Sequence, residues 1–218
     1  MRDSPTRPLA RHRAYREEMS HAELTVDGYR IEPLSPETWE AFADLAERHN
    51  GVWGGCWCTY FHLYPDPPER RELGNREFKH QLVLSGRTHA ALVLDGDEAV
   101  AWAQYGPVQE LANIHHRKEW EAGVVVVPDF RITCLFVDRR YRRKGMATVA
   151  VRGALALIAA AGGGLVEAYP HDLPPGKRTS ASFLYNATRT MYEGLGFEYQ
   201  RPKGKGNCVM TMRVGADA

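Results

Sequence analysis

The hydrophobic and polar residues of the chain follow two periods, one typical of strands and one typical of helices. Two-residue alternation and short apolar runs predict strands at residues 29–34, 89–94, 98–106, 131–137, 165–170, 197–201 and 208–214. Helical spacing predicts helices at residues 35–49, 68–86, 146–161 and 180–195, with a further short helix and a loop expected within 107–122. The aromatic segment 50–67 is rich in Gly and Pro and is expected to be a loop.

The order of these predicted elements, β-α-α-β-β-β-α-β-α-β-β, is typical of a mixed α/β sheet with helices on its faces. The length of 218 residues fits one large domain, which we place at residues 23–218. Residues 1–22 are rich in arginine and lack periodicity, so we expect a flexible basic tail there.

Composition and charge argue against several broad classes of protein. The chain has 28 Lys and Arg against 27 Asp and Glu, and this net charge of +1 disfavours binding to nucleic acid through bulk charge. The longest apolar run, 147–161, is too short to span a bilayer. The first residues lack the apolar core of a secretory signal, and the four cysteines show no disulfide framework. We therefore expect a cytoplasmic protein with neither a membrane nor a nucleic-acid partner.

The densest charge in the chain is the run DRRYRRKGMA, residues 138–147, between a predicted strand and a predicted helix. A helix N-terminus offers unpaired N–H groups and partial positive charge, and a residue such as Gly145 allows close approach of a ligand. The run therefore predicts an anion site of the kind that holds phosphate or diphosphate. A solvated charged turn and a nucleic-acid patch remain open alternatives, whereas the pattern of a Walker P-loop is absent.

Two motifs resemble those of the GNAT N-acetyltransferase superfamily. The first is Arg142-x-x-Gly145-x-Ala147, preceded by a strand that ends in Val137, and the second is MYEGLGF at residues 191–197. The resemblance extends over roughly residues 28–214. It implies a centrally splayed sheet, an acetyltransferase activity and acetyl-CoA as co-substrate, with no metal.

The resemblance also implies which residues bind the cofactor. The N–H of Leu135 would contact the thioester oxygen, and Phe136 and Val137 would pair with the pantetheine arm like an added strand. The diphosphate and its turn would involve Arg142, Arg143, Lys144, Gly145, Met146, Ala147 and Thr148.

Catalytic roles follow from the same resemblance, each with a structural alternative. Tyr192 matches a family tyrosine that acts as general acid toward the leaving thiolate, although it could be a packing residue. Many members carry an Asn seven residues earlier, where this chain has Tyr185 and the neighbouring position is Asn186. That cofactor contact is therefore not expected in the usual form.

The general base has no match at the family's position, because Ile132 stands where some members carry Glu. Glu167 is the best alternative, since burial in an apolar strand would raise its pKa toward a useful range. It could equally be a structural carboxylate. His171 and Asp138 are lesser candidates, and a water chain without a dedicated base is also open.

The acceptor, a small-molecule or peptide amine, would enter over the aromatic loop. The loop residues Trp53, Trp57, Tyr60 and Phe61 could wall its site through apolar or cation–π contacts, and Tyr169 is also expected to contact the acceptor. A small aromatic cluster that packs the loop is an equally open alternative. Cys56, Cys58 and His62 have the spacing C-x-C-x3-H, but a structural zinc site needs four ligands, so no metal is expected.

Three functions from different classes compete on the sequence alone. The first is an N-acetyltransferase, monomeric or homodimeric, that joins amine and acetyl-CoA in a ternary complex. The second is a non-catalytic acyl-CoA-binding regulatory module, which the missing carboxylate at position 132 favours. The third is a nucleic-acid-binding protein that uses the basic run, and the near-neutral charge of the chain opposes it.

Overall fold

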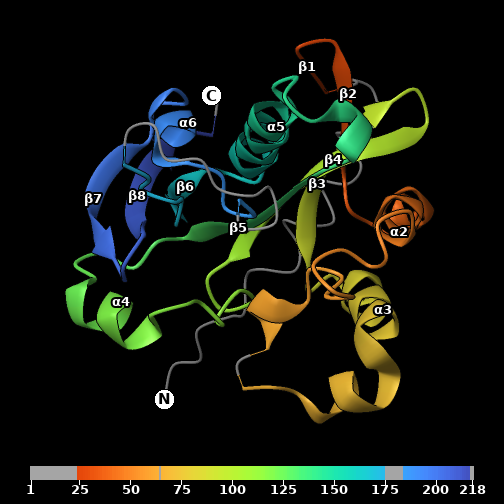
Figure 1. Ribbon diagram of the computed structural model, residues 1–218, viewed down its shortest axis with the longest axis horizontal. Coiled ribbons are helices and arrows are strands. Elements are labelled where there is room, and N and C mark those ends of the chain that lie inside the picture. The colour runs from red at the N-terminus through yellow and green to blue at the C-terminus, as the bar shows by residue number, and fades with distance from the viewer. Residues whose placement is uncertain (1–23, 64, 175–183, 217–218) are drawn as a thin grey trace, which may run out of the picture.

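The computed structural model describes residues 24–63, 65–174 and 184–216. The expected tail at residues 1–22 therefore lies outside the described part of the chain. An eight-stranded sheet forms the centre of the molecule, in the order β1-β2-β3-β4-β5-β6-β8-β7 (Figure 1). The strands are β1 (Thr25–Val26), β2 (Tyr29–Pro33), β3 (His89–Asp95), β4 (Glu98–Pro107), β5 (Phe130–Val137), β6 (Gly164–Ala168), β7 (Glu198–Lys203) and β8 (Asn207–Val214).

Helices cover both faces of this sheet. They are α2 (Trp39–Glu47), α3 (Pro68–Leu84), α4 (Arg117–Gly123), α5 (Met146–Ala160) and α6 (Arg189–Glu193), with short 3-10 turns η1 (Tyr60–His62) and η2 (Arg139–Tyr141). Helix α5 packs on β3, β4 and β5, and its residues share one apolar cluster with that face of the sheet. Helix α2 packs on β4 and belongs to a second cluster on the opposite face. The prediction of a mixed α/β sheet flanked by helices is confirmed.

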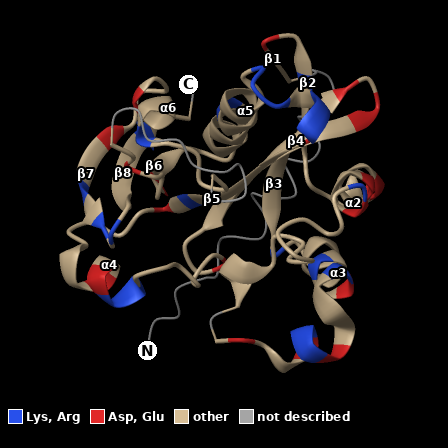
Figure 2. Cartoon of the chain, viewed as in Figure 1, with Lys and Arg blue, Asp and Glu red and all other residues tan. Residues whose placement is uncertain are grey.

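The two layers explain why the central strands are almost free of charge. Figure 2 shows β3 and β4 nearly uncharged through the middle of the sheet, with Lys, Arg, Asp and Glu mostly on helices and at strand ends. Both faces of these strands are buried, so the pattern is a continuous apolar run more than a strict alternation.

The sheet changes direction at β5 and β6, its one parallel pair among the described strands. Their pairing covers three positions and ends at Ile132 opposite Ala168. Beyond Ile132, β5 continues beside β4 alone, and a bulge between Gln104 and Tyr105 shifts that register. The splay expected between these two strands therefore starts directly after Ile132.

Residues 180–183 of the helix expected at 180–195 lie outside the described part of the chain, and residues 184–188 are not helical. Helix α6 begins only after Thr188, which accepts a hydrogen bond from the N–H of Met191 at 3.4 Å as an N-cap. Ala187, just before the cap, has φ 53°, a left-handed conformation that cannot continue a helix. Strand β1 was not predicted, whereas α4 lies within the segment where a short helix was expected.

Candidate active site

The turn between β5 and α5 presents backbone N–H groups to one side of the molecule. Gly145 is the N-cap of α5 with φ 80°, and Arg143 is also left-handed with φ 61°. Such a turn directs successive amides toward one point, and the first turn of α5 adds amides that have no intrahelical acceptor. A Cβ added to Gly145 would meet nothing within 4 Å, so the approach to this backbone is open.

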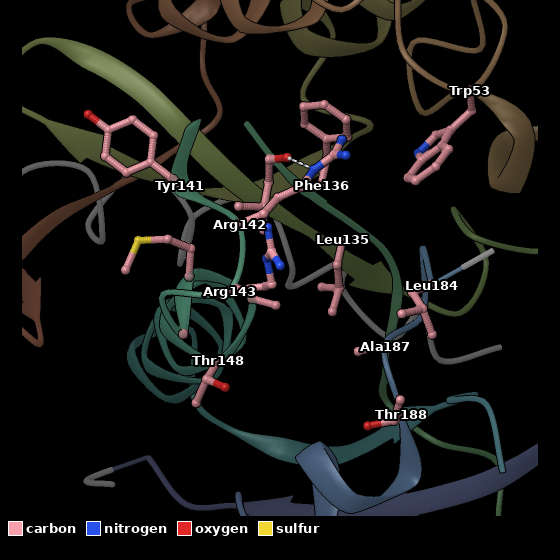
Figure 3. Close-up of a pocket in the computed structure, with 14 residues that line it drawn as sticks. Trp53, Leu135, Phe136, Tyr141, Arg142, Arg143, Thr148, Leu184, Ala187 and Thr188 are labelled. Carbon is pink, nitrogen blue, oxygen red and sulfur yellow. Dashed lines mark hydrogen bonds between the residues drawn. The ribbon is translucent and has the colours of Figure 1, made fainter. Parts of the chain in front are cut away.

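A cavity of about 300 Å³ lies against this turn. It is lined by Trp53, Leu135, Phe136, Val137, Tyr141, Arg142, Arg143, Gly145, Met146, Ala147, Thr148, Leu184, Ala187 and Thr188. Figure 3 shows Arg142, Arg143 and Thr148 on one side, Leu184, Ala187 and Thr188 on the other, and Leu135 between them. Nine of the ten residues expected to bind the cofactor are thus brought together, and Lys144 is the one outside the lining.

The basic run divides into residues that face the cavity and residues that anchor the turn. Arg140 donates to Asp138 and also pairs with Glu98. Burial alone would raise the pKa of Asp138, but the side-chain and backbone hydrogen bonds from Arg140 outweigh it and lower that pKa to about 2. A carboxylate so acidic is a poor base at neutral pH. Asp138 therefore holds the turn in place, while Arg142 and Arg143 reach the cavity.

The amide expected to meet the thioester oxygen has an internal partner. The N–H of Leu135 donates to the carbonyl oxygen of Tyr185 at 2.6 Å, across the gap that opens between β5 and β6. The segment before α6 therefore closes this gap. Tyr185 also contacts Trp53, Phe61 and His115, with ring centroids 6.2 to 6.3 Å apart.

Tyr192 is buried beneath this segment, with 1% of its surface exposed. Its ring packs edge-on against Phe197 at 4.9 Å, and it is not part of the cavity lining. Burial raises the pKa of Tyr192 far above its usual range, so its hydroxyl keeps its proton at neutral pH.

Glu167 lies on β6, opposite Arg131 of β5, and is 3% exposed. One of its carboxylate oxygens accepts hydrogen bonds from the indole N–H of Trp120, at 2.6 Å, and from the hydroxyl of Tyr169. Burial raises the pKa of Glu167, and these hydrogen bonds partly oppose the rise. Glu167 and Tyr169 do not line the 300 Å³ cavity and belong to a separate buried group.

The aromatic loop contributes one residue to the cavity, Trp53. Trp57 is 8% exposed and stacks on Trp39 at 6.2 Å, so it packs the loop onto α2. The hydroxyl of Tyr60 lies 3.2 Å from Nδ1 of His115, near Tyr185.

The cysteine and histidine side chains of the same loop do not converge on one point. Cys58 contacts Cys134, with their Sγ atoms 2.7 Å apart, whereas Nε2 of His62 lies 2.7 Å from Nε2 of Gln104. Within the described ranges, no three His, Cys, Asp or Glu side chains are placed to hold a metal ion.

Some residues around Glu167 gave little signal in the sequence. Trp120, Arg131 and Lys203 surround Glu167, yet they come from α4, β5 and β7. Their only sequence signal is that Arg131 and Lys203 are charged residues in or beside apolar strand patterns, which is rare unless a partner is present.

A mixed sheet that opens beside a glycine-led helix N-terminus defines an α/β protein with a site for an extended anionic ligand. The sequence model of the Acetyltransferase (GNAT) family matches residues 39–172, more than half of the chain. The chain therefore belongs to the GNAT family of acetyltransferases, and its resemblance to that superfamily is confirmed. No protein of curated function matches the sequence. No helix among the described residues is long and apolar enough to cross a membrane.

Several solved structures are similar to this chain. A GNAT-family acetyltransferase from Streptococcus agalactiae is 12% identical, with a TM-score of 0.49, over 87% of this chain and 98% of that one. The ribosomal-protein-S18-alanine N-acetyltransferase of Escherichia coli is 12% identical, with a TM-score of 0.45, over 86% and 94%. The PaiA N-acetyltransferase of Thermoplasma acidophilum, in complex with coenzyme A, is 14% identical, with a TM-score of 0.44, over 84% and 98%.

Proposed function

We propose that this protein is an acetyl-CoA-dependent N-acetyltransferase that acts on a primary amine by direct attack in a ternary complex. The observation that carries the proposal is the 300 Å³ cavity, where the end of β5 meets the open amides of the Gly145 turn. Acetyl-CoA, when bound, supplies an acetyl thioester and a diphosphate. The cavity offers the amides and guanidinium groups that a diphosphate needs and an apolar wall for an arm of carbon, sulfur and amide atoms.

In this proposal the Gly145 turn positions acetyl-CoA, and strand β5 polarises its thioester carbonyl. The amides of residues 143–147, with Arg142 and Arg143, hold the diphosphate. Lys144 adds charge from outside the lining, and Met146, Ala147 and Thr148 shape the turn. Backbone groups of Phe136 and Val137 align the arm, and the N–H of Leu135 stabilises charge on the thioester oxygen. Because that N–H now bonds to the carbonyl of Tyr185, cofactor binding has to displace this carbonyl first.

The chemistry requires one proton to leave the amine and one to reach the leaving sulfur. The amine nitrogen forms the new C–N bond, the C–S bond breaks, and the sulfur departs as thiolate. Tyr192, whose hydroxyl stays protonated at neutral pH, donates a proton to this thiolate and is then reprotonated from solvent; burial raises its pKa and so weakens it as an acid. Glu167 takes the proton of the amine through water, and its raised pKa makes it a better base than an exposed carboxylate.

A non-catalytic acyl-CoA-binding module is the second candidate. Two observations favour it: the Leu135 amide is already bonded within the chain, and the described residues that line the cavity include no carboxylate. Such a module would bind acetyl-CoA without transferring the acetyl group.

A thiol-release assay with acetyl-CoA and a panel of amines separates the two candidates. We expect thiol release that depends on the amine, and a loss in Tyr192→Phe of roughly 100-fold in kcat with little change in acetyl-CoA affinity. Tyr199→Phe is the matched control, because Tyr199 is 38% exposed and lies on β7, and it should retain wild-type rates. Acetyl-CoA binding without thiol release for any amine would refute the transferase and support the module.

A further inference from the structure

A second cavity lies beside the start of β5, at the opposite end of that strand from the Gly145 turn. Its volume is about 230 Å³, and it is lined by Val108, Gln109, Ala112, Ile114, Arg117, Trp120 and Arg131. Four of these side chains are apolar or aromatic, and two are guanidinium groups. The cavity therefore matches a ligand that combines a few carbon atoms with an anionic group.

Arg131 is the buried cation of this cavity, with 3% of its surface exposed. Its Nη1 donates to the carbonyl oxygens of Leu111, at 2.9 Å, and Val108, at 3.3 Å, and its guanidinium lies 4.5 Å from the ring centroid of Trp120. Its Nε is buried and has no hydrogen-bond partner among the described residues. Besides these carbonyl groups and rings, the hydroxyl of Tyr169 interacts with the guanidinium, but a hydroxyl does not supply the counterion that such a buried charge needs.

A second buried cation, Lys203, stands in the same group. It is 2% exposed, lies 4.4 Å from the ring centroid of Tyr169, and donates to the carbonyl of His115. Burial lowers the pKa of Lys203 to about 8, so it still carries its charge at neutral pH. In the described part of the chain, no carboxylate lies within 4.0 Å of Lys203 or of Arg131.

Glu167 is the one buried carboxylate that faces both cations. It is 3% exposed, and its hydrogen bonds come from Trp120 and Tyr169 instead of from either cation. Glu119 and Arg201 also act on Lys203, so three cations face two carboxylates and the group is short of one anion. A ligand carboxylate in the cavity beside Arg131 would balance the group and provide an acceptor for Nε.

The charged group around Arg131 lies at the strand that also carries Leu135, which relates the missing anion to the amine substrate. Arg131 and Leu135 are on the same strand, four residues apart, which is roughly 13 Å in an extended chain. The cofactor cavity lies beyond Leu135 and shares no lining residue with the second cavity, so an acceptor held beside Arg131 would have to extend along β5 to reach the thioester. We propose that the 230 Å³ cavity binds a carboxylate of the acceptor, and that the acceptor is an amino acid or short peptide whose reacting amine lies several bonds from this carboxylate. This inference rests on the proposed N-acetyltransferase function.

Matched acceptors that differ only in the anionic group test this inference. A tripeptide acid and a tetrapeptide acid would each be compared with its C-terminal amide by thiol release from acetyl-CoA, because extended peptides of this length span roughly 10–13 Å. We expect each acid to exceed its amide by roughly 10- to 100-fold in kcat/KM, because a hydrogen bond to a charged group contributes that much. In Arg131→Gln this preference should disappear, whereas acetyl-CoA affinity should not change.

Two further variants keep the test decisive if Arg131→Gln does not fold. Arg117→Gln removes the other guanidinium of the cavity, and its side chain is 34% exposed and pairs with Glu121, so the fold should tolerate the change. We expect the preference for the acid to fall in this variant as well. Arg152→Gln is the control, since Arg152 pairs with Asp27 at the surface, and it should keep the full preference.

The possible failures are distinguishable. If amines without a carboxylate are acetylated as well as the acids, the enzyme assignment stands and the acceptor inference is wrong. The inference is also wrong if the acid preference survives in both Arg131→Gln and Arg117→Gln. If no amine releases thiol although acetyl-CoA binds, the proposed function itself fails. Calorimetric titration of the acids and amides into the CoA-bound protein then still measures their affinity for the 230 Å³ cavity, and equal affinities would refute a carboxylate site.

Discussion

Asp138 provides the sharpest test of how the basic run is held in place. The residue follows β5, is 1% exposed, and accepts a hydrogen bond from the backbone N–H of Arg140 at 2.8 Å. The Arg140 guanidinium lies 2.8 Å from its other oxygen, and Arg48 lies 3.7 Å away. We predict that Asp138→Asn destabilises the protein, because the charge of the carboxylate is lost while the backbone cap can persist.

The pKa of Asp138 sets the size of this expected loss of stability. Its fall from an ordinary value of 3.8 to about 2, at about 1.4 kcal/mol per pKa unit, corresponds to about 2 kcal/mol of folding free energy at pH 7. Because the pKa of Asp138 is lower in the folded than in the unfolded protein, its carboxylate stabilises the fold in full at pH values above the unfolded pKa. This contribution disappears as pH falls through the folded pKa. It should therefore be nearly complete at pH 5, roughly halved at pH 3, and close to zero at pH 1.

Urea unfolding of the wild type and Asp138→Asn at pH 7 and pH 3 measures this contribution. We expect a difference of about 2 kcal/mol at pH 7 and about half of that at pH 3, with a Tm lower by about 5–10 °C at pH 7. Asp27→Asn, which removes an exposed surface pair with Arg152, should change stability by less than about 0.5 kcal/mol. A difference for Asp138→Asn that is under 0.5 kcal/mol, or equal at the two pH values, would refute the electrostatic account.

Three other predictions concern single positions. Gly145→Ala should lower stability by about 1 kcal/mol, because φ 80° strains any side chain, and should raise the KM for acetyl-CoA several-fold. The control Gly96→Ala, at φ 61° in the β3–β4 hairpin, should lower stability by a similar amount with unchanged KM. Gly153→Ala should destabilise by roughly 1–3 kcal/mol in thermal unfolding, because the new Cβ would lie 2.8 Å from Ile31; a neutral result would show that Ile31 can move. The wild type should gain stability relative to Lys203→Met between pH 8 and pH 10, by up to about 3 kcal/mol. The folded pKa of Lys203, about 8, lies below the unfolded value of 10.5, so the unfolded chain binds more protons in that range. Parallel stability curves for these two proteins would contradict the low pKa.

The parts of the fold that the sequence predicts are those controlled by local interactions. Helix α5 is apolar nearly all round and follows Gly145, so both its burial and its start are visible in the residues themselves. Helix α6 was overestimated because nothing in the run before Thr188 shows that Ala187 adopts a left-handed φ. That conformation accompanies tertiary contacts of the segment, including the hydrogen bond from Leu135 to Tyr185.

The candidate site also has one part that the sequence predicts and one part that it does not. The ten residues expected to bind the cofactor are nearly contiguous in sequence, and nine of them line the cavity. The group around Glu167 brings together α4, β5, β6 and β7, and no spacing rule relates residues so far apart in sequence. Sequence patterns identified Glu167 and Tyr169, but the cations that face them became visible only in three dimensions.

The hydrogen bond from Leu135 to Tyr185 has a kinetic consequence. The resting protein uses one of its own peptide groups as an intramolecular competitor for the amide that would polarise the thioester. Its effective concentration does not depend on dilution, and because it is a carbonyl of the main chain, no side-chain substitution deletes it. The rate of productive acetyl-CoA capture should therefore reach a plateau at high acetyl-CoA concentration, set by how often this peptide group swings away.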